Sequence, residues 1–394
     1  MQSTDRPETR LATRLAFLVA GFALACWAPL VPFAKEQLGV DDGVLGMLLL
    51  CLGLGSVAAM LVTGILSARY GSKPIILAAG LGLAGILPCL TVASTPFTLG
   101  LALAAFGASL GSMDVAMNIH AVEVEKGADR PLMSGFHALF SIGGFIGSLL
   151  VTLLLSIKAG PFVATLLCSA LMVFAIAVAW PRLLKTAQSE DAPLFVIPRG
   201  FVLLLALLAA ITFLVEGAIL DWSALLLTTE GRVGASHGGL GYMLFAIAMT
   251  AGRLGGDAVT ARIGDRAILF WGGIVAIAGF AILLLSPVTI LAMSGFLLIG
   301  LGASNIVPVL FRKGGAQTAM PSGLAVAAIT MTGYAGVLIG PAGMGFVADH
   351  IGLPGSFWAL AVLLCAAPLC AGIVTRNQDQ EEDDAHRPYR SMDA

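Results

Sequence analysis

The chain has 394 residues, of which 58% are hydrophobic and only 11% are charged, and its formal net charge is −2. This composition excludes an ordinary soluble domain and indicates a protein embedded in a lipid bilayer. The near-neutral charge gives no sign of a nucleic-acid partner, and we expect none.

Apolar runs long enough to cross a bilayer follow one another along the whole chain. We predict an all-α membrane protein with twelve transmembrane helices, arranged as two pseudo-symmetric halves of six. The predicted spans cover about 11–33, 44–66, 74–93, 98–121, 132–155, 160–180, 201–227, 238–260, 267–285, 288–311, 322–347 and 354–374.

The second half of the chain repeats the first at an offset of about 195 residues. Trp27 recurs as Trp222, and Ala68-Arg-Tyr-Gly71 recurs nearly in register as Ala261-Arg-Ile-Gly264. A duplicated and strongly apolar chain is typical of secondary transporters, whose substrate sites lie at the interface of the repeats.

We therefore predict an N-terminal half over 1–180, a cytoplasmic linker over 181–199 and a C-terminal half over 200–375, followed by a disordered acidic cytoplasmic tail over 376–394. Lysine and arginine predict the orientation, because they concentrate on the cytoplasmic side. With the N-terminus inside, 17 of them fall in cytoplasmic segments and three in outer segments. We expect both termini in the cytoplasm and the protein in the inner membrane.

The loop after the second span, Gly64-Ile-Leu66-Ser-Ala-Arg69-Tyr-Gly71-Ser-Lys73, resembles the loop between helices 2 and 3 of the major facilitator superfamily, whose pattern is G-x-L-x-D-R-x-G-R-K. Arg262-Ile-Gly264 matches the equivalent region of the second half. The acidic position of the pattern is Ala68 in the first half and Ala261 in the second. In that family the acid helps to lock the cytoplasmic gate. The resemblance therefore implies the fold, but it does not imply the same locking contact, because the acid is missing from both halves.

Five residues are candidates for gating. Four-residue spacing makes two of them, Arg253 and Asp257, an i,i+4 pair near the inner end of their span. A structural ion pair at the helix end is the alternative for that pair. The predicted gating residues are Arg69, Lys73, Arg253, Asp257 and Arg262.

The resemblance also implies that the first, fourth, seventh and tenth spans line a central cavity. We expect Glu216 and Asp114 to carry a proton, because an acid inside the membrane costs roughly 2.5–3.5 kcal/mol and is functional by default. The alternative for both acids is a hydrogen-bonded tie between helices, and for the tryptophans a place in the interfacial belt. The predicted substrate-binding residues are Asp114, Asn118, Asn305, Trp27 and Trp222.

Asp114-Val-Ala-Met-Asn118 resembles the acid-x-A-x-N pattern in helix 4 of fucose–proton symporter-type carriers, where the acid belongs to the sugar and proton pathway. Over the whole chain, the sequence is similar to YbjJ-type bacterial inner-membrane carriers. The G-x-x-x-G-P pattern that drug antiporters carry in helix 5 is absent from 143–147 and occurs instead at 336–341, which disfavours an antiporter.

We predict a monomeric secondary active transporter rather than an enzyme, working by alternating access to take up a small polar solute, sugar-like or a related metabolite, together with protons. A carboxylate in a low-dielectric cavity can exchange a proton near neutral pH, whereas sodium requires several clustered oxygen ligands. No cofactor or metal is expected, since no histidine, cysteine or acid cluster has metal-site spacing. The alternatives are a proton-driven exporter of drugs or metabolites and a membrane receptor without net transport.

Overall fold

The structure, a computed structural model, describes residues 6–40, 42–128, 130–185, 198–233 and 238–376. These residues form helices and no strand, which confirms the predicted all-helical membrane fold. The N-terminal part contains α1 (Pro7–Trp27), η1 (Ala28–Leu30), α2 (Val31–Leu38), α3 (Asp42–Tyr70), α4 (Ser72–Val92), α5 (Pro96–Lys126), α6 (Met133–Ser156), α7 (Pro161–Ala179) and η2 (Trp180–Arg182). The C-terminal part contains α8 (Gly200–Thr229), α9 (Leu240–Leu285), α10 (Thr289–Ala303), α11 (Ile306–Ala316) and α12 (Ser322–Leu364).

The number of membrane-crossing segments differs slightly from the prediction. Within the described residues, 11 helical segments are long and apolar enough to cross a membrane, against the twelve expected. The difference arises because α9 runs through two predicted spans, although Gly264 breaks its helical geometry between them. Gly352 makes a similar break inside α12, and the helical chain then continues, past a turn at Cys365, to Arg376.

The backbone repeats the duplication that the sequence shows. Gly71 turns the chain between α3 and α4 with φ 78° and ψ 164°, and Gly264 turns it within α9 with φ 79° and ψ 163°. L side chains rarely adopt this conformation, so both turns require glycine. Two loops far apart in the sequence therefore make the same sharp turn for the same physical reason.

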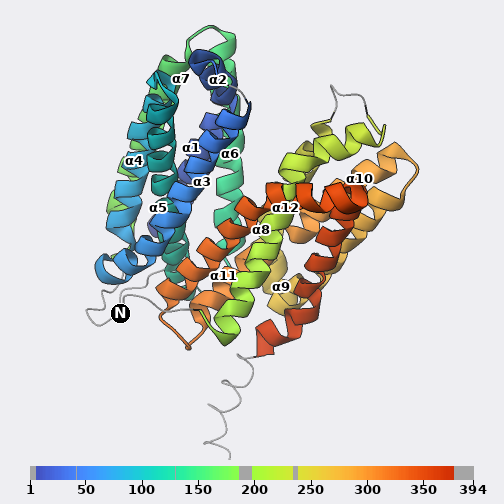
Figure 1. The fold of residues 1–394 in the computed structure, drawn as a ribbon. Coiled ribbons are helices and arrows are strands. Elements are labelled where there is room, and N and C mark those ends of the chain that lie inside the picture. Colours follow the sequence, from blue (N-terminus) through green and yellow to red (C-terminus); the bar gives the residue numbers. More distant parts are fainter. Residues whose placement is uncertain (1–5, 41, 129, 186–197, 234–237, 377–394) are drawn as a thin grey trace, which may run out of the picture.

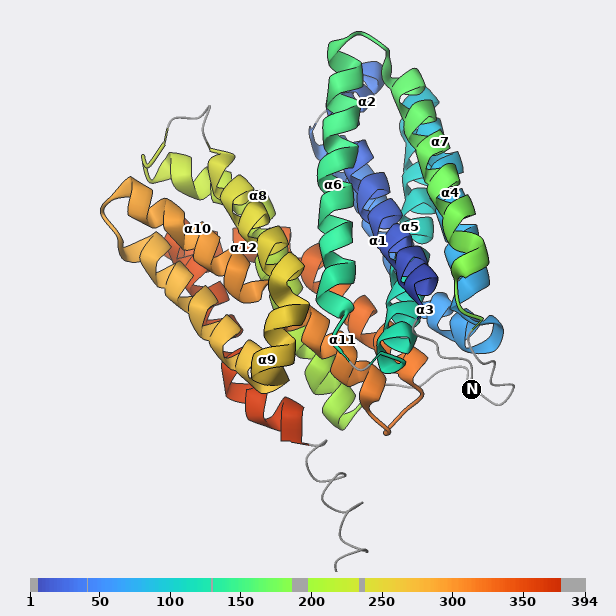
Figure 2. The same ribbon diagram turned by 180° about the vertical axis from the view of Figure 1, so that it is seen from behind.

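The helices form two bundles, α1–α7 and α8–α12, which Figure 1 shows side by side. The most extensive packing in the first bundle joins α3 to α5 and α1 to α6, and the equivalent pairs in the second bundle are α9 with α10 and α8 with α12. Between the bundles, α6 packs on α9 and α3 packs on α12. The bundles lie together at the end near α11 and diverge toward the opposite end, as both views show (Figures 1 and 2).

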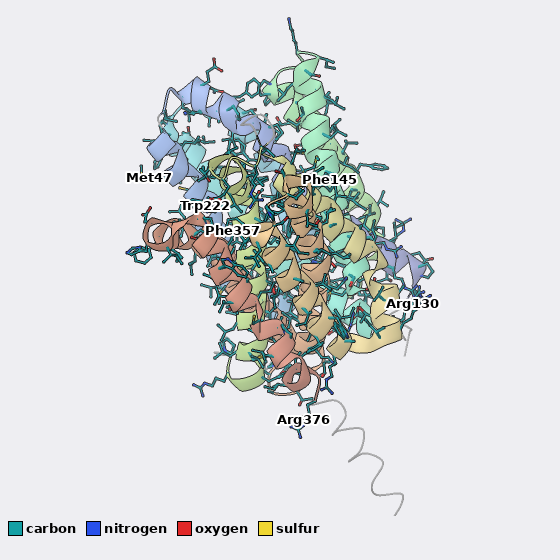
Figure 3. The ribbon with its side chains drawn as sticks, turned by 90° about the vertical axis from the view of Figure 1, so that its right-hand side faces the viewer. Met47, Arg130, Phe145, Trp222, Phe357 and Arg376 are labelled. Atoms are coloured by element: carbon teal, nitrogen blue, oxygen red, sulfur yellow. The ribbon has the colours of Figure 1, made fainter. Side chains whose placement is uncertain are left out.

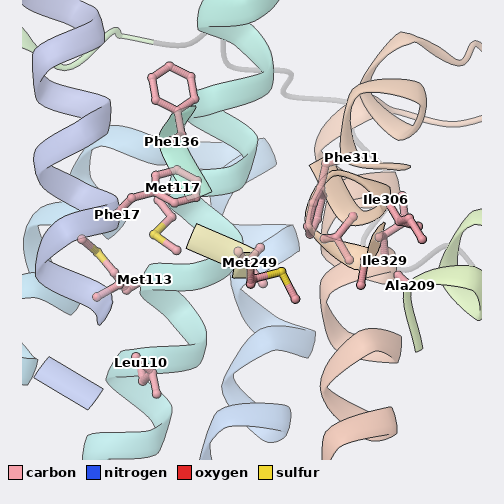
Figure 4. Packing of buried hydrophobic residues seen from close by; sticks show 14 of the residues in the cluster. Phe17, Leu110, Met113, Met117, Phe136, Ala209, Met249, Ile306, Phe311 and Ile329 are labelled. Carbon is pink, nitrogen blue, oxygen red and sulfur yellow. The ribbon is translucent and has the colours of Figure 1, made fainter. Parts of the chain in front are cut away.

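Buried apolar side chains from both bundles face each other near the line where the bundles meet. Figure 4 shows Phe17, Met117 and Phe136 on one side and Ile306 and Phe311 on the other, and all five are at most 1% exposed. Large apolar side chains also cover the outside of the molecule, as expected for a surface that contacts lipid tails. The core and the lipid-facing surface are thus both apolar, so polar side chains between the helices stand out.

Basic residues mark one end of the molecule. Arg130 and Arg376 lie toward the lower end of Figure 3, whereas Met47 lies toward the upper end. The lower end is where the bundles meet and where the predicted orientation places the cytoplasm. The predicted linker lies largely outside the described residues, at 186–197, and so does the predicted acidic tail, at 377–394.

Candidate functional site

Asp114 and Asn118 lie on one face of α5, as their spacing predicts. The Asn118 side-chain amide donates to the backbone carbonyl of Asp114 at 2.9 Å and approaches its carboxylate at 3.4 Å. Asp114 is 8% exposed, and within the described part of the chain its carboxylate takes part in no salt bridge. The buried side-chain oxygen of Asn118 has no hydrogen-bond partner. This pair therefore keeps an acceptor for a further ligand.

Glu216 of α8 is the other predicted proton carrier, and it comes from the second bundle. Its carboxylate lies 3.5 Å from the guanidinium of Arg253 on α9, and its side chain is 33% exposed. Tyr334 of α12 interacts electrostatically with both Asp114 and Glu216. The two predicted proton carriers thus come from opposite bundles, and each interacts with the same tyrosine.

Arg253 and Asp257 have different partners from the ones that their spacing suggests. The i,i+4 spacing favours a pair within α9, but both side chains reach across to α6 in the other bundle. Arg253 donates to the hydroxyl of Ser141 at 3.0 Å. Asp257 accepts the backbone N–H groups of Ser134 and Gly135 at 2.9 and 2.8 Å. We call this zone, Ser134–Ser141 of α6 against Arg253–Asp257 of α9, the seam.

The first turn of α6 is held by two carboxylates, one from each bundle. The first four N–H groups of a helix have no partner within it and form its positive end. Glu125 at the end of α5 accepts those of Leu132 and Met133 at 2.6 and 2.7 Å. Asp257 accepts the next two. Two of these four N–H groups, those of Ser134 and Gly135, therefore have their partner only while the bundles are together.

A chain of charges closes the same end of the molecule. Glu125 pairs with Arg312 of α11, which also pairs with Asp265 just after the Gly264 turn. Lys313 adds a contact to Asp265 at 3.1 Å. Glu125, Asp265 and Arg312 line a cavity of about 430 Å³ with walls from both bundles. Alanine stands at both positions where the family pattern has an acid, Ala68 and Ala261. Two other acids, Glu125 and Asp257, join the bundles at this end.

Arg312, Glu125 and Asp265 are not among the site residues that the sequence predicts. Charges at the inner ends of spans are expected in any membrane protein. Nothing in the local sequence distinguishes those that pair across two bundles. A long-range signal, such as coupled variation of Glu125 with Arg312, would have been needed to find them.

His137 adds an aromatic contact within the seam. Its ring lies edge-on to Phe17 of α1, with centroids 5.1 Å apart, and stacks on Phe311 of α11 at 5.7 Å. The Nε2 atom of His137 is buried and has no hydrogen-bond partner. His137 therefore lies between the two bundles.

The basic residues of the family-like loop have local partners. Lys73 donates to the backbone carbonyl of Leu183 at 3.2 Å and lies 4.7 Å from the ring centre of Trp180. Arg69 lies over the ring of its neighbour Tyr70. Arg262 is exposed on α9. In this conformation the polar contacts across the seam come from Asp257 and Arg253, and a gating role for the loop residues stays a prediction.

Within the described part of the chain, the other three predicted substrate-binding residues make no hydrogen bond to either acid. Asn305 donates to the carbonyl of Gly252 at 3.0 Å and to Ser304 at 2.9 Å, which joins the break between α10 and α11 to α9. Trp27 is buried at the end of α1, and its ring N–H has no partner. Trp222 lies against α12. Contacts of these three with a substrate stay predictions.

This arrangement, two helical bundles with polar side chains where they face each other, is that of a multi-spanning membrane transporter rather than an enzyme. The model of the Major Facilitator Superfamily matches residues 14–313. The chain belongs to the Major Facilitator Superfamily.

Three curated proteins are similar over most of the chain, and one of them is named as an MFS-type transporter. An uncharacterised MFS-type transporter of Yersinia pestis is 46% identical over 368 residues, which cover 93% of this chain and 96% of that protein. An uncharacterised transporter of Sinorhizobium fredii is 32% identical over 347 residues, 84% of this chain and 89% of that protein. The membrane protein MosC of Rhizobium meliloti is 31% identical over 352 residues, 88% of this chain and 85% of that protein.

Solved structures share the fold at low sequence identity. The fucose:proton symporter FucP in its outward conformation has a TM-score of 0.76 and 14% identity, covering 95% of this chain and all of that chain. A bacterial homologue of the iron transporter ferroportin in its outward-facing state has a TM-score of 0.70 and 18% identity over the same shares. At these identities the similarity shows the fold alone.

Proposed function

We propose that this transporter takes up a small polar solute, sugar-like or a related metabolite, together with protons. The observation that carries the proposal is the placement of Asp114 and Glu216, one in each bundle, near the same tyrosine. An ionisable side chain inside a membrane span points to ion or substrate transfer. The similarity of the Asp114–Asn118 pattern to fucose–proton symporter-type carriers supports the same direction.

We assign the two acids different tasks. Asp114 has no salt bridge within the described residues, and it lies beside the unpaired oxygen of Asn118. A carboxylate and an amide together accept from and donate to hydroxyl groups, so this pair fits a hydroxyl-rich solute. Glu216 already has a cation beside it, Arg253. A change in the charge of Glu216 can therefore change the contacts of Arg253, as a coupling site requires.

We further propose that the structure corresponds to the outward-facing state. The bundles meet at the end that carries Glu125, Arg312 and Asp257, and diverge at the other end (Figure 1). If the termini are cytoplasmic, as the lysine and arginine distribution favours, the closed end faces the cytoplasm. We propose that the transporter is a monomer in the inner membrane and alternates between this state and one that opens inward.

The proposal is tested by gradient-driven uptake. A thermal-shift screen of the purified protein against sugars, polyols, nucleosides, amino acids and drugs identifies a ligand, because a ligand that binds only the folded state raises apparent stability. A pH gradient is then imposed across the membrane of proteoliposomes that contain the transporter, and uptake of the ligand is measured. We expect concentrative uptake that Glu216→Gln abolishes, while exchange of the solute across the membrane remains.

The matched control is Glu36→Gln, the same chemical change at an exposed position of α2. It should accumulate the solute as the parent does. Undiminished accumulation by Glu216→Gln would remove Glu216 from the coupling role, and export against the gradient would favour the exporter. A ligand that binds without any flux would favour the receptor.

A further inference from the structure

Three successive turns of α6 contact the second bundle, each by different chemistry. Ser134, His137 and Ser141 are spaced by three and four residues and so share one face of the helix. The first turn meets Asp257 through backbone N–H groups, the second meets an aromatic ring of α11, and the third meets Arg253 through a hydroxyl. The seam is therefore a series of three contacts along α6, and the contact of Arg253 with Ser141 is the one nearest the middle of the helix.

Arg253 differs from the other seam residues because it also contacts a proposed coupling residue. Its Nη1 donates to Ser141 in the first bundle at 3.0 Å, and its Nη2 lies 3.5 Å from Glu216 in its own bundle. The side chain is only 6% exposed, and its Nε atom is buried without a partner. A cation buried to this degree is costly unless a counter-ion accompanies it. Glu216 is the only acid in a salt bridge with it among the described residues.

We propose that Arg253 is the positioning residue that makes the α6–α9 seam depend on the charge of Glu216. An ionised Glu216 holds the guanidinium where it also reaches Ser141. A neutral Glu216 removes the counter-ion, so a buried cation is left unpaired and the guanidinium leaves this position. The contact of Arg253 with Ser141 is then lost, and the seam is held only by the contacts of Ser134, Gly135 and His137.

This inference rests on the proposed proton role of Glu216 and adds the route by which a proton changes the conformation. Protonation loosens the contact between the bundles at the closed end, which is the direction of inward opening. Deprotonation of Glu216 restores its ion pair with Arg253 and re-forms the contact of Arg253 with Ser141. The proton and the movement are thus linked through one side chain rather than through the whole bundle.

Other titratable groups also surround the pair. His137 of α6 interacts with Arg253. Tyr242 of α9 interacts with Glu216, Arg253 and Asp221, and Tyr334 of α12 interacts with Glu216 and Asp114. Because several groups could respond to bulk pH, a pH titration alone would not identify the route. Substitutions that remove one group at a time do.

The test is a double-mutant cycle between Glu216→Gln and Ser141→Ala, read out as the ratio of outward-open to inward-open molecules. Spin labels on Ser156→Cys of α6 and Glu230→Cys beyond α8, in full-length protein without its native cysteines, report the separation of the two bundles in liposomes. A cycle isolates the interaction between two positions from the separate effect of each. Ser148→Ala, two turns further along α6, is the matched control for loss of a serine hydroxyl.

We expect Glu216→Gln to lower the outward-to-inward ratio about tenfold in the parent and in Ser148→Ala, the effect of about one hydrogen bond to a charged group. In Ser141→Ala the same substitution should change the ratio less than about twofold. Ser141→Thr keeps the hydroxyl and should keep the full response. Arg253→Lys, which loses the planar fork that holds two partners, should lose most of it.

Equal, additive shifts in the Ser141→Ala and parent backgrounds would overturn the inference, and so would an unchanged ratio in Glu216→Gln. The outcome is separable from that of the proposed function. If Glu216→Gln still concentrates solute, the coupling role that the proposed function gives to Glu216 fails. If it abolishes concentration but the two substitutions act additively, only the route through Arg253 fails. Should Ser141→Ala not fold, the comparison of Ser141→Thr with Arg253→Lys gives the same decision.

Discussion

Replacing Asp257 by asparagine should shift the transporter toward its inward-open state. Asp257 accepts two backbone N–H groups of α6, from Ser134 at 2.9 Å and Gly135 at 2.8 Å, and these bonds exist only while the bundles are together. Asparagine keeps one acceptor oxygen, but it places an NH₂ group where the second oxygen was. It also removes the negative charge from the positive end of the helix.

The size of the shift follows from these contacts. A hydrogen bond to a charged group contributes about 1.5–3 kcal/mol, and a charge at a helix end contributes about 0.3–1 kcal/mol. Losing one such bond and the charge costs about 2 kcal/mol in the closed-seam state, and little in the state where the seam is open. That difference changes the ratio of the two states about 30-fold.

The assay is the distance between spin labels on Ser156→Cys and Glu230→Cys, with Asp349→Asn as the control. Asp349 is exposed on α12, so the same chemical change there should leave the distance distribution as it is. In Asp257→Asn the population with a short distance between the labelled ends should grow. An unchanged distribution, or a larger outward-open fraction, would refute the reasoning and leave Asp257 as a local helix cap.

Three further predictions concern the contacts around the seam and the polar pair. A Cβ on Gly256 would lie 1.8 Å from the side-chain oxygen of Asn305. Gly256→Ala should therefore lower the melting temperature and destabilise the closed seam by about 1–3 kcal/mol. Gly255→Ala should do neither, because the space around Gly255 is open. Glu125→Gln leaves Arg312 with one fewer counter-ion and should lower thermal stability by about 1–3 kcal/mol, measured by unfolding in detergent; equal stability would show that the pair is not needed. Asn118→Ala should weaken binding of the ligand found by screening about tenfold or more without unfolding the protein, and an unchanged dissociation constant would make Asn118 only a helix tie.

Much of the fold could be predicted because it depends on signals that are local and repeated. Apolar runs define the spans, and the recurrence of Gly71 as Gly264 predicts two equivalent turns, which the backbone angles show. The count of separate helices was less certain, because a glycine turn can leave two spans in one continuous helix, as α9 shows.

The contacts between bundles could not be predicted in the same way. Arg253 and Asp257 share a helix face, and this spacing alone favours a pair with each other. Their actual partners are a hydroxyl and two backbone N–H groups on α6, and the sequence does not encode how close α6 lies. Backbone donors carry no sequence signal at all, so the cap on α6 by Asp257 becomes visible only in three dimensions.

Proton-coupled uptake predicts that protons enter together with the solute, and this can be measured. Proteoliposomes with a trapped pH-sensitive dye start without any pH gradient, and the solute identified by screening is added outside. We expect the interior to acidify as the solute enters, and we expect this acidification to be lost in Glu216→Gln and to persist in Glu36→Gln. Entry of the solute in the parent protein with no change in internal pH would contradict proton-coupled uptake.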